Sequence, residues 1–280
     1  IAITWDYELF FGEKSGTVEK CLIEPTNELL RIAEKTNAKF TFFVDSGMLY
    51  YGAKQLEFKT QHEQIVSQIN KWETSFHETG LHIHPHWEDT TYDNDWIFNV
   101  ERYKLSDFND EAIESIFESY FAALKEFSKS EIISFRAGGW CIQPFNKLKK
   151  SFLKHGLKID SSVFRGGENF TPPYSYSFKS IPNLDKWNFD DHESVYNENG
   201  DFTEIPISSK NYSPYFFWKL FVLGRLNKHL HKPIGDGFPV RGGGSKKDLL
   251  TKYHKLCVSA DGYFITEIEK TIQEAERNGS

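Results

Sequence analysis

Three histidines, His82, His84 and His86, lie at alternating positions in the sequence. In an extended strand, side chains at alternating positions point to the same side of the chain. The neutral ring nitrogens of histidine are common ligands of zinc and related metals. If Pro85 ends the strand, His82 and His86 could still converge, one from the strand and one from the loop after it. The spacing therefore predicts a metal site, and three surface histidines without a ligand are the alternative.

Two carboxylates, Asp6 and Glu8, follow residues 1–5, whose β-branched and aromatic side chains predict a buried first strand. Because they are two positions apart, both side chains can point to the same side. At such a place one carboxylate can bind a metal and the other can act as a general base. The alternative is a pair of solvated turn residues, which would be the preferred reading if the histidines were absent.

Further polar residues adjoin the ends of other predicted strands. Asp45 follows the predicted strand 39–44, Arg136 follows the predicted strand 131–135, and Asp160 lies near the end of another. An arginine at such a place can hold a carboxylate through a two-pronged contact. Functional residues of α/β barrels lie at the carboxyl ends of the strands. The shared placement of these residues therefore favours one functional site at one rim.

Strands and helices alternate along the chain, which predicts parallel β/α units in a single (β/α) barrel domain over residues 1–280. Two irregular stretches, near residues 88–108 and 164–200, predict inserted loops, either beside a substrate or as lids over the rim. Residues 215–230 are strongly apolar and predict a helix. We expect it to pack in the core or at an interface, with a membrane anchor as the less favoured alternative.

Composition limits the classes of partner. The chain has 40 acidic and 33 basic residues, a net charge of -7 and no long basic run, so we expect no nucleic-acid partner. Its three cysteines are widely spaced and predict no disulfide framework, which suggests a reducing, cytoplasmic location. No stretch approaches the ~20 apolar residues that span a bilayer, and no secretion signal is visible. Nothing in the sequence predicts an oligomeric state.

The order of these motifs resembles that of the polysaccharide deacetylases with NodB homology, carbohydrate esterase family four. The first family motif is a strand that ends in Asp-Asp, or in Asp-x-Asp/Glu in a divergent branch. Here it is similar to Thr4-Trp5-Asp6-Tyr7-Glu8. The resemblance implies that Asp6 is the catalytic base and that Glu8 is a metal ligand. It also implies a distorted or seven-stranded barrel.

Three further motifs carry the resemblance, which covers residues 3–163 well and the remainder weakly. Gly80, His82 and His86 match Gly-x-His-x-x-x-His, which implies that the two histidines bind the metal. Arg136 and the small residues after it match the third motif, whose arginine holds the base carboxylate. Asp160 and the serines after it resemble the fourth.

The chain departs from the family pattern in two places. Tyr7 stands where the second Asp of the first motif is usual, so the metal would depend on Glu8. The fifth motif normally places a histidine on the last strand as the general acid, but residues 255–261 contain none. Either another residue, such as His84 or His192, donates the proton, or catalysis is impaired.

The resemblance implies a hydrolase that removes an N- or O-linked acetyl group from a sugar or polysaccharide precursor, with a divalent metal, zinc being the expected ion. We expect Trp87 and Trp140, which adjoin the second and third motifs, to bind this carbohydrate. We expect His84, Asp45 and Asp160 to support the site.

Two other functions stay open at this point. A deacetylase fold without the usual general acid could bind a glycan and leave it intact. A glycoside hydrolase on a related barrel would need two carboxylates that straddle a glycosidic bond. Asp6 and Glu8 lie too close in sequence to favour that arrangement.

Overall fold

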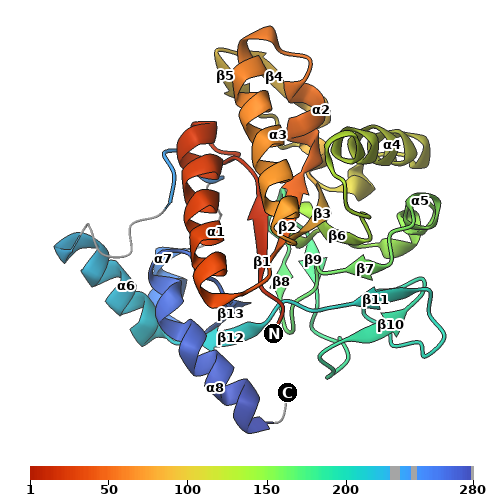
Figure 1. The fold of residues 1–280 in the computed structure, drawn as a ribbon. Helices are drawn as coiled ribbons and strands as arrows, with labels where there is room; N and C mark the ends of the chain where they lie inside the picture. Colours follow the sequence, from red (N-terminus) through yellow and green to blue (C-terminus); the bar gives the residue numbers. More distant parts are fainter. Residues whose placement is uncertain (228–233, 241–244, 279–280) are drawn as a thin grey trace.

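A seven-stranded sheet forms the centre of the computed structural model, which describes residues 1–227, 234–240 and 245–278 (Figure 1). Neighbouring strands follow the order β1-β2-β3-β6-β7-β11-β10, and every neighbouring pair is parallel except β10 with β11. The expected α/β fold with a mostly parallel sheet is therefore present. Closure of the sheet into a barrel stays a prediction. The strands are β1 Thr4–Tyr7, β2 Thr41–Asp45, β3 Glu78–Ile83, β6 Ser134–Ala137, β7 Ile159–Asp160, β10 Trp187–Phe189 and β11 Phe202–Glu204.

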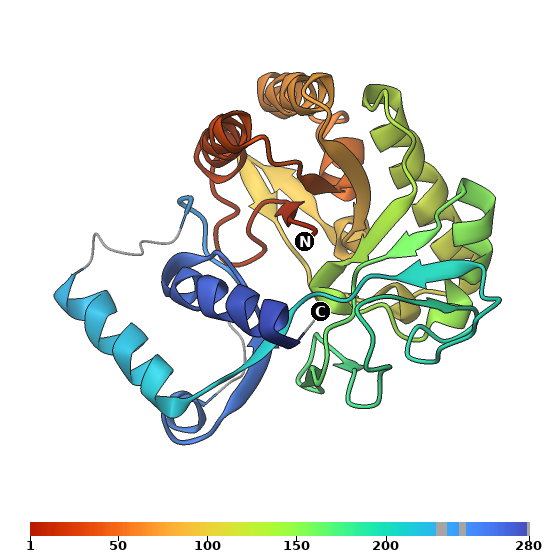
Figure 2. The same ribbon diagram turned by 60° about the horizontal axis from the view of Figure 1, so that its bottom comes forward.

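Helices cover the outside of this sheet, as both ribbon views show (Figures 1 and 2). The helix α4 illustrates why they form: the Asn109 side chain accepts a hydrogen bond from the Ala112 amide, and the buried face carries apolar residues such as Phe117 and Leu124. The sheet-covering helices are α1 Glu24–Thr36, α2 Ser46–Gly52, α3 Lys59–Thr74, α4 Asp110–Phe127 and α5 Lys149–His155, and a π-helix, Glu19–Ile23, precedes α1.

The helix α5 is short because of a proline before it. Pro144 disfavours helical geometry at Gln143, so the chain makes only a 3-10 turn, Phe145–Lys147, before α5 begins at Lys149. The other 3-10 turns are Leu56–Phe58, Pro85–Asp89, Leu105–Asp107, Gly138–Trp140 and Gly262–Glu267.

Both predicted insertions contain short hairpins. Within residues 88–108 the strands β4 Thr91–Asp93 and β5 Asp95–Ile97 pair antiparallel around Asn94, whose φ of 58° suits a tight hairpin turn. Within residues 164–200 the strands β8 Glu168–Asn169 and β9 Tyr176–Ser177 form a second hairpin.

The last predicted strand lies outside the central sheet. The strand β13 His254–Cys257 pairs antiparallel with β12 Ser209–Tyr212 in a separate two-stranded sheet. This small sheet packs with α6 Pro214–Leu226 around a second apolar cluster, centred on Tyr212, Phe216 and Phe217. The remaining helices are α7 Lys246–Thr251 and α8 Ile268–Asn278. None of the helices among the described residues is long and apolar enough to cross a bilayer.

Candidate active site

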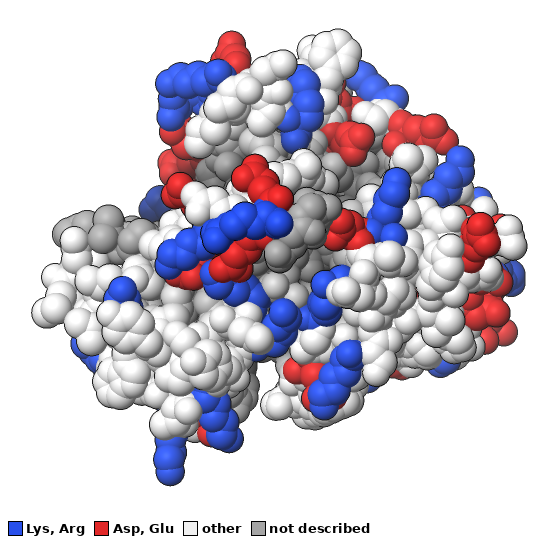
Figure 3. Space-filling view, turned by 90° about the horizontal axis from the view of Figure 1, so that it is seen from below, with Lys and Arg blue, Asp and Glu red and all other residues white. Residues whose placement is uncertain are grey.

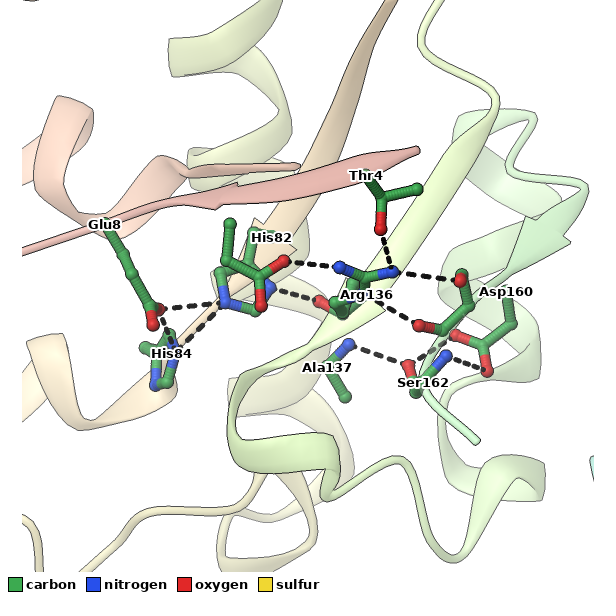
Figure 4. Close-up of polar contacts among 10 residues, drawn as sticks. Thr4, Glu8, His82, His84, Arg136, Ala137, Asp160 and Ser162 are labelled. Carbon is green, nitrogen blue, oxygen red and sulfur yellow. Dashed lines mark hydrogen bonds and ion pairs between the residues drawn. The ribbon is translucent and has the colours of Figure 1, made fainter. Parts of the chain in front are cut away.

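Three potential metal ligands converge at the carboxyl ends of β1 and β3: Glu8 follows β1, His82 lies near the end of β3, and His84 follows it (Figure 4). Glu8 Oε2 lies 3.0 Å from His82 Nε2 and 2.7 Å from His84 Nε2, and the two imidazole nitrogens are 3.1 Å apart. Ligand atoms that share an ion at bond lengths of about 2.0–2.2 Å are roughly 3.0–3.5 Å from one another. The observed separations are close to these values, and two imidazoles with one carboxylate form a donor set that suits zinc and related metals.

The sheet fixes the orientation of His82. This residue is the register partner of Arg136 on β6, and its Nδ1 donates a hydrogen bond to the Arg136 carbonyl oxygen at 2.8 Å. With the proton on Nδ1, a neutral ring can offer the lone pair of Nε2 to a bound cation. Backbone carbonyls orient metal-binding histidines in this way.

A glycine makes room for His84. A Cβ atom on Gly138 would lie 2.5 Å from His84 Nδ1, which is closer than two such atoms can approach. The third-motif glycine therefore allows the turn after β6 to pass directly against the imidazole. Its absent side chain is a requirement for the position of His84.

His86, which the motif resemblance implies as a ligand, lies outside this group, and His84 takes its place. The 3-10 turn that begins at Pro85 ends the strand, so the alternating pattern stops after His84. The ring of His86 is fully buried, 4.5 Å from that of Phe11 and 5.4 Å from that of Tyr103. Neither of its nitrogens has a hydrogen-bond partner among the described residues. Burial, and then the charge of His84, lower the pKa of His86 well below its usual value, so the ring is neutral.

Charges within the group favour a cation. Burial would raise the pKa of Glu8, but His84 and His82 together lower it, so this carboxylate is ionised. Burial opposes charge on His82, yet the hydrogen bond to Glu8 and the nearby carboxylates raise its pKa to about 9. The acidic residues thus attract positive charge to the point where the three ligands meet.

Asp6 and Arg136 form the second part of the site. Arg136 Nη1 donates to Asp6 Oδ1 at 2.6 Å, and the buried guanidinium lies 4.2 Å above the Phe43 ring. Its other donors bind Thr4 Oγ1 and the Ser161 carbonyl oxygen, both at 2.8 Å. The two-pronged contact expected from the sequence is therefore replaced by a single contact to Asp6. The Asp6 side chain keeps 32% of its surface exposed, so it stays accessible to a reactant.

Asp160 supports the site from beneath and does not join the ligands. It is fully buried and accepts from Ser162 Oγ at 2.6 Å, and that oxygen accepts from the Ala137 amide at 2.8 Å. Glu204, its register partner on β11, is also fully buried. Burial, followed by the charge of Asp160, raises the pKa of Glu204 well above its usual value, so a protonated Glu204 donates to Asp160. Sequence reasoning missed Glu204, although a lone carboxylate in the apolar strand 202–207 was a possible signal.

Trp87 does not fit the predicted contact with substrate, because its side chain is fully buried. Its Nε1 donates to Asp45 Oδ2 at 2.6 Å. Asp45 is also fully buried, and burial raises its pKa to about 6 against the opposing charges of His84 and His82. Trp140 is half-buried and packs 5.3 Å from Phe164, so it remains a candidate for sugar contact.

No histidine among the described residues replaces the usual general acid. His192 lies exposed in the second insertion, and the His254 ring on β13 contacts the carbonyl oxygen of Asp248 instead of the site. The residue of β13 whose pKa responds to Asp6 and Arg136 is Cys257. Burial raises the pKa of its thiol to about 12, although the charge of Arg136 opposes this shift.

Two tyrosines beside His84 were missed from the sequence because they come from different insertions. The Tyr103 ring lies 5.5 Å from the His84 ring and 4.7 Å from that of Tyr174. Burial, followed by the charge of Tyr174, raises the pKa of Tyr103 well above its usual value. Both hydroxyls therefore stay protonated and can donate hydrogen bonds close to the ligand group.

No family model and no curated protein matches this chain, whereas four chains of solved structures do, including the two described next. One is a "putative polysaccharide deacetylase from Mycobacterium smegmatis", with 15% identity, a TM-score of 0.39, and coverage of 74% of this chain and 58% of the other. The second is the Xyl-CE4 domain of a multidomain xylanase from the hindgut metagenome of Trinervitermes trinervoides, with 15% identity, a TM-score of 0.32 and 60% coverage of both chains. The chain thus spans less than two thirds of either neighbour. These neighbours carry the name of the family that the motifs resemble, and neither likeness is close enough to assign this chain an activity.

Proposed function

We propose that this protein is a metal-dependent hydrolase that removes an N- or O-linked acetyl group from a sugar or polysaccharide precursor. The observation that carries the proposal is the convergence of Glu8, His82 and His84 close to the Asp6–Arg136 pair. The first three residues form a metal-binding donor set, and Asp6 is a carboxylate base held in place by Arg136. Activation of a water molecule requires both. We keep one domain over residues 1–280 and a cytoplasmic location as predictions.

Glu8, His82 and His84 would hold the divalent ion, with zinc as the expected metal. When bound, such an ion would lower the pKa of water and polarise the acetyl carbonyl. Asp6 would accept the proton of the attacking water through its exposed surface. Arg136 fixes the orientation of the Asp6 carboxylate, because its guanidinium is itself held by Thr4 and Ser161.

The leaving group decides between the two acetyl linkages. An amine must be protonated as it leaves, whereas the alkoxide of an ester leaves more readily. Since residues 255–261 contain no histidine to act as the general acid, an O-linked acetyl group fits this chain better than an N-linked one. Tyr103, whose ring lies 5.5 Å from that of His84, and Tyr174 beside it are candidate proton donors to the leaving group.

The absence of a histidine in residues 255–261 also favours a second candidate, a protein that binds a glycan without cleaving it. A glycoside hydrolase is disfavoured, because Asp6 is engaged by Arg136 and Glu8 by the histidines. The two carboxylates therefore do not face each other across a space for a glycosidic bond.

Metal content and acetate release test the proposal together. The purified protein is expected to bind about one zinc ion per chain and to release acetate from acetylated sugars, and His82→Ala should lose both properties. His192→Ala, which changes an exposed histidine, is the matched control and should retain both. Bound zinc with sugar binding but no acetate release would favour the glycan-binding candidate. Full zinc occupancy in His82→Ala would contradict the ligand assignment.

A further inference from the structure

The helix α6 carries apolar side chains on two opposite sides. On the inner side, Phe216 and Phe217 are buried in the second apolar cluster. On the outer side, Tyr215, Trp218 and Leu226 are 67%, 50% and 80% exposed. Large exposed apolar surfaces of this kind mark sites of interaction with other molecules.

These outer residues form one continuous strip. Tyr215, Trp218, Val222 and Leu226 follow one another at intervals of three and four residues, which places them along one face of the helix. A shallow apolar groove of about 380 Å³ lies along the strip. The groove is lined by Tyr215, Trp218, Lys219, Val222, Leu223 and Tyr263.

Two basic residues, Lys219 and Arg225, lie on α6 beside the strip. Residues 205–235 contain five lysines and arginines and no Asp or Glu, although the whole chain has a net charge of -7. On α6, Lys219 Nζ lies 4.5 Å from the centre of the Tyr215 ring, and Arg225 Cζ lies 3.6 Å from that of Phe221. Within the described residues, neither cation forms an ion pair with a carboxylate. In Figure 3 the left part of the surface is largely uncharged and carries scattered Lys and Arg side chains with little acidic surface.

We propose that the outer face of α6 docks on a membrane surface rich in anionic phospholipid. Tryptophan and tyrosine favour the membrane–water interface, because their rings are apolar and their N–H or O–H groups are polar. Lysine and arginine beside them are attracted to anionic headgroups. No described helix is suited to span a bilayer, so the contact is peripheral.

A second copy of the chain is a poorer occupant of this face. A symmetric dimer would bring the same patch of both copies together and place Lys219 and Arg225 near their own counterparts. Like charges at close range oppose such a contact, whereas an anionic membrane complements it. This proposal concerns α6 alone and does not depend on the proposed hydrolase activity.

Flotation of the full chain with lipid vesicles tests the proposal. The protein should float with vesicles of phosphatidylcholine mixed with phosphatidylglycerol, stay unbound with phosphatidylcholine alone, and lose binding as salt rises. Tyr215→Ser/Leu226→Ser should abolish flotation. Lys219→Gln/Arg225→Gln should lower the partition coefficient roughly 10- to 30-fold, because each basic residue near an anionic surface contributes about 1 kcal/mol.

Matched variants control for exposed apolar and basic residues in general. Leu56→Ser/Phe170→Ser changes two exposed apolar residues away from α6, and Lys35→Gln/Lys186→Gln changes two exposed lysines. Both should float like the wild type, and the circular dichroism of all variants should match. Failure of the wild type to float with either vesicle would overturn the proposal. So would a dimer in sedimentation that the α6 variants dissociate, since that result identifies the face as an interface between copies.

Discussion

Arg136 binds His82 through its backbone and Asp6 through its side chain. The carbonyl oxygen of Arg136 accepts from His82 Nδ1 at 2.8 Å, while its Nη1 donates to Asp6 Oδ1 at 2.6 Å. Arg136 therefore sets both the tautomer of the candidate ligand His82 and the orientation of the candidate base Asp6. Because different parts of the residue make the two contacts, substitution can separate them.

Arg136→Lys should lower kcat roughly 10²- to 10³-fold with metal content unchanged. A lysine keeps the backbone carbonyl that orients His82 but lacks the guanidinium that fixes Asp6. Acetate release and zinc content measured on the same preparation would check this. Zinc lost in parallel with activity would show that the two contacts are not separable.

His84→Ala and His86→Ala distinguish the two possible ligand sets. His84→Ala should weaken zinc binding by at least about 100-fold, because it removes a donor that lies 2.7 Å from Glu8. His86→Ala should retain zinc but lower the free energy of unfolding by about 2–4 kcal/mol, because it leaves a cavity among Phe11, Phe98 and Tyr103. Zinc titration with urea unfolding measures both quantities. Zinc lost in His86→Ala but retained in His84→Ala would instead support His82 and His86, the ligand pair that the motif resemblance implies.

Gly138→Ala should displace His84 without removing any ligand. The added methyl group would lie 2.5 Å from Nδ1, so the imidazole must move and zinc affinity should fall roughly 10- to 100-fold. Gly224→Ala is the matched control, because a Cβ atom there meets nothing within 4 Å. Unchanged zinc affinity in Gly138→Ala would indicate that His84 does not bind the metal.

Glu204→Gln should stabilise the protein increasingly as pH rises. The pKa of Glu204 is raised above its unfolded value of about 4.3, so its contribution to stability is complete below that pH and is lost as pH rises toward the folded pKa. Glutamine does not titrate and keeps a donor for Asp160. The variant should be roughly 1–3 kcal/mol more stable than wild type at about pH 8 and nearly equal at about pH 4.

Urea unfolding across this pH range measures the effect. Glu198→Gln changes an exposed carboxylate as the control and should give a difference close to zero throughout. A Glu204→Gln difference that does not vary with pH would mean that Glu204 is ionised in the folded protein.

The sequence predicted those parts of the site that depend on strand ends and their order. The alternation of side chains placed Asp6 with Glu8 and His82 with His84 on shared sides, and the motif resemblance implied the ligand role of Glu8. The Asp6–Arg136 contact follows from parallel strands that end at one rim. The choice between His84 and His86 could not be predicted, because it depends on whether the strand ends before Pro85 or continues through it.

Other features depend on pairings between distant segments. Glu204 stands out as a carboxylate among apolar neighbours, but its position opposite Asp160 could not be predicted, because that contact requires the register between β7 and β11. The pairing of β13 with β12 likewise places Cys257 outside the central sheet, where an alternating β/α pattern would have added a further parallel strand. The predicted helix 215–230 is present as α6 to Leu226, and residues 228–230 lie outside the described part of the chain.

The separate β12–β13 sheet has a consequence for how this protein can evolve. The candidate ligands and the Asp6–Arg136 pair all come from residues before Gly138, whereas α6 packs on the β12–β13 sheet. Substitutions on the outer face of α6 therefore leave the reacting groups undisturbed. Selection can therefore alter the exposed face of α6 without altering the residues of the candidate active site.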